Sequence, residues 1–111
     1  MKPPDPLAER IVGLLTPLGP VRARRMFGGH GLFLDDLMFA LISGGALYFK
    51  ADGETEDAFR AAGSRPFTYR RQGKDVALSY WRAPEGALDG MAALAPWAEQ
   101  AIAAARRTRA Q

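Results

Sequence analysis

Few side chains in this 111-residue sequence are of the kinds that carry out catalysis, and the single histidine is the first to consider. His30 stands between Gly29 and Gly31, and an imidazole exposed in a turn there could titrate near neutral pH. One histidine excludes a paired-histidine metal site and leaves any catalytic triad with one base at most. With no partner group identified, we interpret His30 as a hydrogen-bonding loop residue, and a chemical role for it stays open.

The other candidate groups lack the spacing that catalysis or metal binding requires. Ser43, Ser64 and Ser79 show no nucleophile-elbow pattern. Asp35 and Asp36 are adjacent, so on a strand or turn their carboxylates would point apart and hold neither a metal ion nor a shared proton. There is no cysteine, which excludes disulfides, thiol chemistry and thiolate metal sites. We therefore expect no catalytic residue, no metal, no cofactor and no enzymatic activity.

Glycines gather in residues 24–34, which read RRMFGGHGLFL. Glycine is used where the backbone takes a positive φ or approaches another backbone closely, so three glycines in four positions indicate unusual chain geometry. The run matches neither nucleotide-binding glycine fingerprint, and it leads into a strand where those motifs lead into a helix. We predict that a basic strand bends here and re-enters the sheet, with Met26 and Phe27 anchoring the corner in the core. A small-ligand site that uses the corner and His30 is the weaker alternative.

Composition indicates one soluble globular domain. Hydrophobic residues make up 48% of the chain, and a domain of this size buries roughly two-thirds of the surface that its unfolded chain exposes. The N-terminus lacks an apolar signal region, and the longest apolar run, residues 37–42, is far shorter than the ~20 residues that span a bilayer. We expect a cytoplasmic protein without membrane association, with a single domain over residues 1–111, a core at about 7–107 and flexible ends at 1–6 and 108–111.

Apolar periodicity and turn residues predict an α+β fold. Residues 7–18 carry apolar side chains at helical spacing, and the proline- and glycine-rich residues 17–20 end that helix. Acidic residues open a short helix within residues 52–62, which Gly63 stops. Strands are expected over residues 21–26, 31–34, 37–43, 46–51, 67–71 and 76–81.

Short turns between the strands predict how the sheet is built. Two-residue turns join antiparallel neighbours, so the first three or four strands should form a meander. Parallel pairing would need long crossovers that the chain lacks. We predict a single two-layer domain, in which an antiparallel sheet of about five to six strands packs against the N-terminal, middle and C-terminal helices.

Pro96 interrupts the apolar stripe of the C-terminal region. Proline is tolerated in the first turn of a helix but disrupts a helix interior. We therefore predict a short helix that ends at about Leu94 and a main helix that begins at about Ala95 and frays into a basic tail.

Aromatic and basic residues alternate in the last two predicted strands, and this pattern has two interpretations. Phe67, Tyr69 and Trp81 could present a stacking surface for single-stranded nucleic acid, or they could pack under a helix as part of the core. Packing under a helix is favoured, because helices must cover one face of a small sheet. The formal net charge is +3, and the candidate nucleic-acid contacts are Arg22, Arg24, Arg70, Arg71 and Lys74.

Ordered sequence blocks from about Val21 to Ala105 resemble the N-terminal domain of the TfoX/Sxy competence regulators. The likeness covers nearly the whole chain, which makes it more specific than any one glycine motif. The residues that carry it are Arg25, Met26, Phe27, Gly28, Gly29, Gly31, Phe39, Tyr48, Lys50, Pro66, Phe67, Tyr69, Tyr80 and Trp97.

The resemblance implies an α+β fold similar to the secretion-chaperone-like architecture. It also implies a regulatory role, because TfoX/Sxy proteins are transcriptional co-activators of competence genes that work with the cyclic-AMP receptor protein and are not known as enzymes. Those regulators carry a second, C-terminal helical domain, and we expect this sequence to be a stand-alone N-terminal-domain protein without their co-activation of competence genes.

We therefore expect a regulatory or adaptor module that acts through protein contacts, with the transcription machinery or a cyclic-AMP-receptor-type regulator as its partner. Direct nucleic-acid binding through a basic sheet face is the alternative, and a small-ligand binder is the weaker one. An exposed sheet edge could also pair two chains as a homodimer.

Overall fold

The structure is a computed structural model that describes residues 6–26 and 29–110, except for the side chains of residues 76 and 77. The helices are α1 (Pro6–Leu15), α2 (Glu56–Ala61) and α3 (Met91–Ala110), with short 3-10 helices at Thr16–Leu18 and Ala87–Asp89. The strands are β1 (Arg22–Met26), β2 (Gly29–Leu34), β3 (Leu37–Ser43), β4 (Ala46–Lys50), β5 (Pro66–Arg71) and β6 (Lys74–Arg82).

The strands form one six-stranded antiparallel sheet in the order β1-β2-β3-β4-β6-β5. This confirms the predicted α+β fold, and the first four strands form the predicted meander. After β4 the chain passes through α2 before the β5–β6 hairpin returns. Since β6 pairs with β4, β5 lies at the sheet edge opposite β1.

Three hairpins have two-residue turns in which both residues have a positive φ. The pairs are Asp35 and Asp36, Gly44 and Gly45, and Gln72 and Gly73. Left-handed backbone at both positions matches the right-handed twist of the flanking strands, which is why such turns join antiparallel neighbours. The turn chemistry read from the sequence therefore accounts for the local connections of the sheet.

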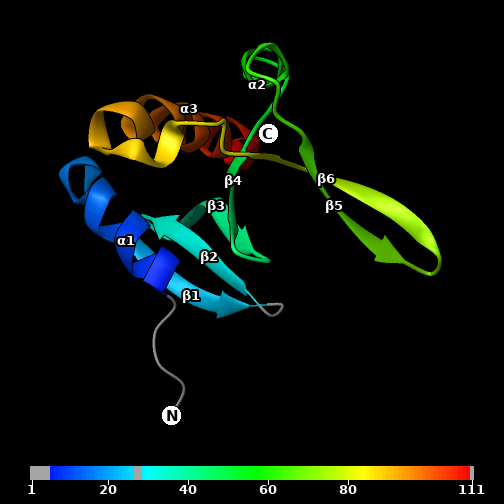
Figure 1. The fold of residues 1–111 in the computed structure, drawn as a ribbon, viewed down its shortest axis with the longest axis horizontal. Coiled ribbons are helices and arrows are strands. Elements are labelled where there is room, and N and C mark those ends of the chain that lie inside the picture. The colour runs from blue at the N-terminus through cyan, green and yellow to red at the C-terminus, as the bar shows by residue number, and fades with distance from the viewer. Residues whose placement is uncertain (1–5, 27–28, 111) are drawn as a thin grey trace.

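The three helices lie on one face of the sheet and form the second layer (Figure 1). Helix α3 packs on β3 and β4, α1 packs on β1, and α2 packs on β6. Between the layers lies one apolar core, whose largest fully buried side chains are Phe39, Phe49, Phe59, Ile11, Leu15, Leu32, Ile42, Leu47 and Leu94. Burial of this apolar surface is the main force that holds helices and sheet together.

Phe59 anchors the six-residue helix α2, which is too short to be stable by itself. Its ring is fully buried, with its centroid 6.1 Å from that of Trp81 in β6 and 4.9 Å from that of Trp97 in α3. One side chain thus ties together α2, the hairpin and the C-terminal helix.

The predicted break of the C-terminal helix at Pro96 is wrong. Helix α3 runs without interruption from Met91 to Ala110, with Pro96 inside it. Proline removes the hydrogen bond to the carbonyl four residues earlier, here that of Ala92. Ala92 and Pro96 are both exposed, so water can solvate that carbonyl and the helix continues.

Candidate functional site

One face of the sheet is not covered by a helix in the described part of the chain, and we call it the open face. Antiparallel partners share a face, and successive residues of a strand alternate between faces. Ala40, Phe49 and Trp81 are paired across β3, β4 and β6 and are buried under the helices. Their neighbours in the same strands therefore point to the open face, including Leu41, Tyr48 and Tyr80.

A cavity of about 590 Å³ hollows the open face. Strands β1 to β3 line one side of it, and the β5–β6 hairpin, which extends away from the helices in Figure 1, lines the other. The volume is within the range of sites that hold a small molecule or an anchoring side chain. The lining residues are Met26, Gly29, His30, Met38, Leu41, Ile42, Ser43, Phe67, Tyr69, Leu78 and Tyr80.

The aromatic residues of the hairpin divide between the two faces. The sequence favours packing of all three aromatic residues, Phe67, Tyr69 and Trp81, under a helix. Trp81 does pack under α2, but Phe67 and Tyr69 line the open-face cavity, so the prediction is wrong for these two residues. The Phe67 ring lies 4.9 Å from that of Tyr48 in an edge contact and 6.5 Å from that of Tyr69 in a stacked one. Residues of β5 thus carry aromatic side chains to the helix-free face.

Tyr80 and Lys50 are the polar groups best placed beside the cavity. The Tyr80 hydroxyl donates to the Met38 carbonyl oxygen at 3.5 Å, and burial raises the pKa of Tyr80 to about 12, so the phenol is neutral at physiological pH. The Lys50 Nζ lies 5.4 Å from the centroid of the Tyr80 ring and donates to Ser79 Oγ at 2.5 Å. Burial lowers the pKa of Lys50, and the Asp52 carboxylate opposes that shift.

The glycine corner is explained by close packing. A Cβ at Gly29 would lie 2.0 Å from the Ile42 carbonyl oxygen, and one at Gly31 would lie 2.8 Å from the Met26 sulfur. The predicted anchoring of Met26 in the core is wrong: Met26 is half-buried and lines the open-face cavity, because its partner in the register is Gly29. The predicted positions of Phe27 and Gly28 lie outside the described residues.

His30 lies in a strand, so its predicted position in a turn is wrong. It pairs with Arg25 in β1 and with Ile42 in β3, and it is half-buried. It borders the open-face cavity and also a second cavity of about 540 Å³ beside α1. No group of three or more histidine, aspartate or glutamate side chains that could hold a metal ion occurs in residues 6–26 and 29–110.

The candidate nucleic-acid contacts are not brought together. Arg22 and Arg24 lie on β1 at one edge of the sheet, whereas Arg70, Arg71 and Lys74 lie at the opposite edge. Arg70 is also engaged locally, since its guanidinium contacts Asp75 at 3.4 Å and the Gly73 carbonyl at 3.0 Å. Arg22, Arg24, Arg71 and Lys74 share the open face but lie toward its opposite edges, and Arg70 is on the other face, so the five residues do not form one cluster.

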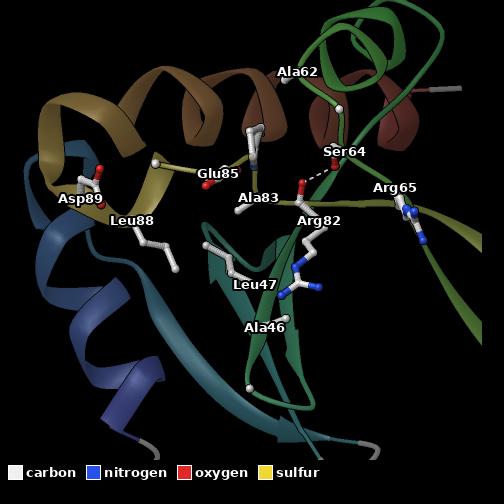
Figure 2. Close-up of a pocket in the computed structure, with 14 residues that line it drawn as sticks. Ala46, Leu47, Ala62, Ser64, Arg65, Arg82, Ala83, Glu85, Leu88 and Asp89 are labelled. Carbon is white, nitrogen blue, oxygen red and sulfur yellow. Dashed lines mark hydrogen bonds between the residues drawn. The ribbon is translucent and has the colours of Figure 1, made fainter.

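A further cavity of about 500 Å³ lies where the start of β4, the segment after α2 and the residues at and after the end of β6 meet (Figure 2). Ser64 Oγ donates to the Arg82 carbonyl at 2.5 Å, so this hydroxyl serves the backbone. The Arg82 side chain extends toward Ala46 and away from Arg65. The described residues that line this cavity include two carboxylates, those of Glu85 and Asp89, and no histidine.

The residues that carry the family resemblance concentrate at the open-face cavity. Five line it, Tyr48 and Lys50 lie beside it, and Phe39 is in the core. The site residues predicted from the sequence do not include five others that line the cavity, which are Met38, Leu41, Ile42, Ser43 and Leu78. Leu78 could have been found from strand alternation, because residues two apart in a strand point to the same face and Leu78 lies two residues before the family residue Tyr80. The five family residues that line the cavity are Met26, Gly29, Phe67, Tyr69 and Tyr80.

No helix among the described residues is long and apolar enough to cross a membrane.

Comparison with known proteins confirms the resemblance. The chain is 34% identical over 79 residues to the DNA transformation protein TfoX1 of Aliivibrio fischeri, covering 71% of this chain and 38% of that protein. It is 35% identical over 74 residues to the protein Sxy of Escherichia coli, covering 64% of this chain and 34% of that protein. The chain thus spans little more than a third of the length of these relatives. Because residues 13–105 match the family model for the TfoX N-terminal domain, the chain belongs to that family.

Proposed function

We propose that this protein is a non-enzymatic regulatory adaptor that binds another protein through the open face of its sheet. One observation carries the proposal: family residues from four separate strands converge on a single cavity on the face that the helices leave bare. A core needs only the helix-covered face. An apolar hollow on the other face is typical of a binding surface.

The relatives support the regulatory part of the proposal. One is named a DNA transformation protein, and the shared family supports a regulatory role. The partner that we propose is therefore a component of the transcription machinery or a cyclic-AMP-receptor-type regulator. Direct nucleic-acid binding has less support, because its candidate residues lie at opposite sheet edges.

The Leu78→Asp variant tests the proposal in the source organism. Leu78 lines the cavity and is 38% exposed, so a carboxylate there should be tolerated by the fold but should block an apolar contact. Thr68→Asp is the matched control, since Thr68 is exposed on the other face of the same hairpin. Thermal unfolding of both purified variants checks that they fold equally well.

We expect Leu78→Asp to reproduce the transcript changes of a gene deletion, measured by RNA sequencing, while Thr68→Asp retains the wild-type pattern. A folded Leu78→Asp protein that supports wild-type transcript levels would exclude the open face as the functional surface.

A further inference from the structure

The charged strand residues of the open face are all positive. The strands contain a single carboxylate, that of Asp75, which pairs with Arg70 on the other face. Strand register places six cations and no anion among the strand residues of the open face. These cations are Arg22, Arg24, Lys50, Arg71, Lys74 and Arg82.

Three of these cations lie beside aromatic residues of the open face. Lys50 is over Tyr80, and the Arg24 guanidinium carbon lies 5.6 Å from the centroid of the Phe33 ring. Arg82 pairs with Tyr48 in the register. No described carboxylate lies within ion-pair distance of Lys50, Arg24 or Arg82. An apolar hollow on a face whose cations form no described ion pair is complementary to an apolar group flanked by anions.

The β1 end of this surface is partly compensated. Asp35 and Asp36, in the turn after β2, share a surface hollow with Arg22 and Arg24. Arg82, on β6, likewise shares a hollow with Glu85 and Asp89, and the Asp52 carboxylate raises the pKa of Lys50 against the larger effect of burial. These carboxylates all lie outside the strands, and none of them forms a described ion pair with Lys50 or Arg82.

The shape of the cavity favours a protein side chain over a nucleic-acid base. Much of the lining is aliphatic or thioether, from Met26, Met38, Leu41 and Leu78, and such side chains adapt to an inserted apolar group. Base stacking instead needs flat, exposed ring faces. Tyr80 is half-buried with its hydroxyl on the Met38 carbonyl, so it serves as a wall of the hollow.

The chain's own acidic and apolar segment is not available as the occupant. Residues 52–59 combine carboxylates with Phe59, but that ring is fully buried in the core. Asp52 is bound to Arg107, with its Oδ2 2.6 Å from Nε. A second copy of this chain would have to unfold the segment in order to offer it.

We infer that the open face binds an acidic amphipathic segment of a different protein. A large apolar side chain of that segment enters the cavity, and flanking aspartates or glutamates face Lys50 and Arg82. This inference rests on the proposed function, and it adds the chemistry by which the partner is recognised.

Selection of a phage-displayed library of random linear peptides on the immobilised full chain tests the inference. We expect the enriched peptides to carry a large apolar residue flanked by Asp or Glu. Leu78→Asp should weaken the best peptide by at least about tenfold, because the apolar anchor would meet a charge. Lys50→Ala and Arg82→Ala should each weaken it roughly two- to fivefold, and added salt should weaken it further.

The charge-reversed double variant Lys50→Glu/Arg82→Glu should lose acidic peptides. Arg25→Glu/Arg106→Glu is its matched control, because it changes the net charge equally but alters β1 on the helix side and the exposed surface of α3. The control should bind the peptides as the wild type does.

Four outcomes would overturn the inference. Enriched peptides could lack acidic residues, or no peptide could depend on Leu78. Mixed-sequence single-stranded RNA could bind the open face in place of peptides, or light scattering could show a homodimer that Leu78→Asp dissociates. If Lys50→Glu/Arg82→Glu regulates transcripts normally while Leu78→Asp does not, the proposed function stands and the acidic partner is excluded.

Discussion

Gly29 has no room for a side chain, and this makes it a test of the close packing between β2 and β3. A Cβ there would lie 2.0 Å from the Ile42 carbonyl oxygen, a backbone atom that cannot rotate away. By contrast, Gly13 is exposed within α1 and would have no atom within 4 Å of a Cβ.

We expect Gly29→Ala to lower the free energy of unfolding by about 1–3 kcal/mol, because the strands must shift apart. Gly13→Ala should raise it by about 0.5–1 kcal/mol, because alanine is the better helix former. Urea unfolding followed by circular dichroism measures both. Equal stability of Gly29→Ala and the wild type would mean that β2 and β3 are not packed as described.

Asp52 joins the end of β4 to the C-terminal helix. Its carboxylate accepts from Arg107 Nε at 2.6 Å and from Nη2 at 3.1 Å, and Arg107 also contacts Glu54 at 2.9 Å. The hydrogen bond with Arg107 is the main cause that lowers the pKa of Asp52, and burial opposes it. The folded state therefore favours the ionised carboxylate.

A lowered pKa in the folded state fixes the sign of the pH dependence. The ionised Asp52 carboxylate contributes its full stabilisation of the folded state above its pKa in the unfolded chain, about 4. This contribution is lost as the pH falls through the lower pKa of Asp52 in the folded state. We expect wild type to exceed Asp52→Asn in stability at pH 7 and to lose that advantage below about pH 4. Glu99→Gln, which removes an exposed carboxylate outside any described ion pair, is the control in thermal unfolding. A pH-independent difference for Asp52→Asn would contradict the assignment.

Among the elements, α3 shows where local rules and packing compete. Proline lowers helix propensity at Pro96, yet residues on the opposite side of α3, such as Leu94, Ala98 and Ala101, are buried against the sheet. Burial of that face holds the helix together across the missing hydrogen bond.

We expect Pro96→Ala to raise the free energy of unfolding by about 1–2 kcal/mol. The N–H of alanine can donate the missing hydrogen bond to the Ala92 carbonyl. The gain in stability is reduced because loss of proline also gives the unfolded chain more conformational freedom. Glu99→Ala, an exposed substitution in the same helix, should change stability by less than about 0.5 kcal/mol. Chemical denaturation measures both variants. A loss of stability in Pro96→Ala would show that proline at this position is required for the packing of α3.

At the scale of the whole molecule, the sheet order separates the basic residues. Arg22 and Arg24 are on one edge strand, and Arg71 and Lys74 belong to the hairpin at the other. The two groups of basic residues cannot contact neighbouring phosphates together. Binding to a nucleic acid should therefore release few of the counterions that are condensed on its backbone.

We expect mixed-sequence duplex DNA to bind with a Kd weaker than about 10⁻⁴ M at physiological salt, and with a log–log salt slope no steeper than about 3. Fluorescence anisotropy across a salt series measures both quantities. Submicromolar binding with a steep slope, lost in Arg22→Ala/Arg24→Ala, would instead favour the nucleic-acid alternative.

The sequence by itself determined the hairpin turns and the alternation of residues along the strands, but not the course of the C-terminal helix through Pro96 or the position of His30 in a strand. Turn residues such as Asp35, Gly44 and Gly73 place the hairpin ends, because left-handed backbone and short loops are properties of a few adjacent residues. Alternation also determined which residues of a strand share a face. The family blocks identified the fold before any contact was known.

Only the tertiary structure decided which face of the hairpin is covered. The β5–β6 hairpin carries aromatic residues on both faces, so alternation cannot tell which face is buried, that of Trp81 or that of Phe67 and Tyr69, which line a cavity. The choice depends on where α2 and α3 pack, and the pairing of β6 with β4 depends on contacts between segments distant in sequence. The open face and its charge therefore arise from the assembly of the layers, which no single segment of the sequence specifies.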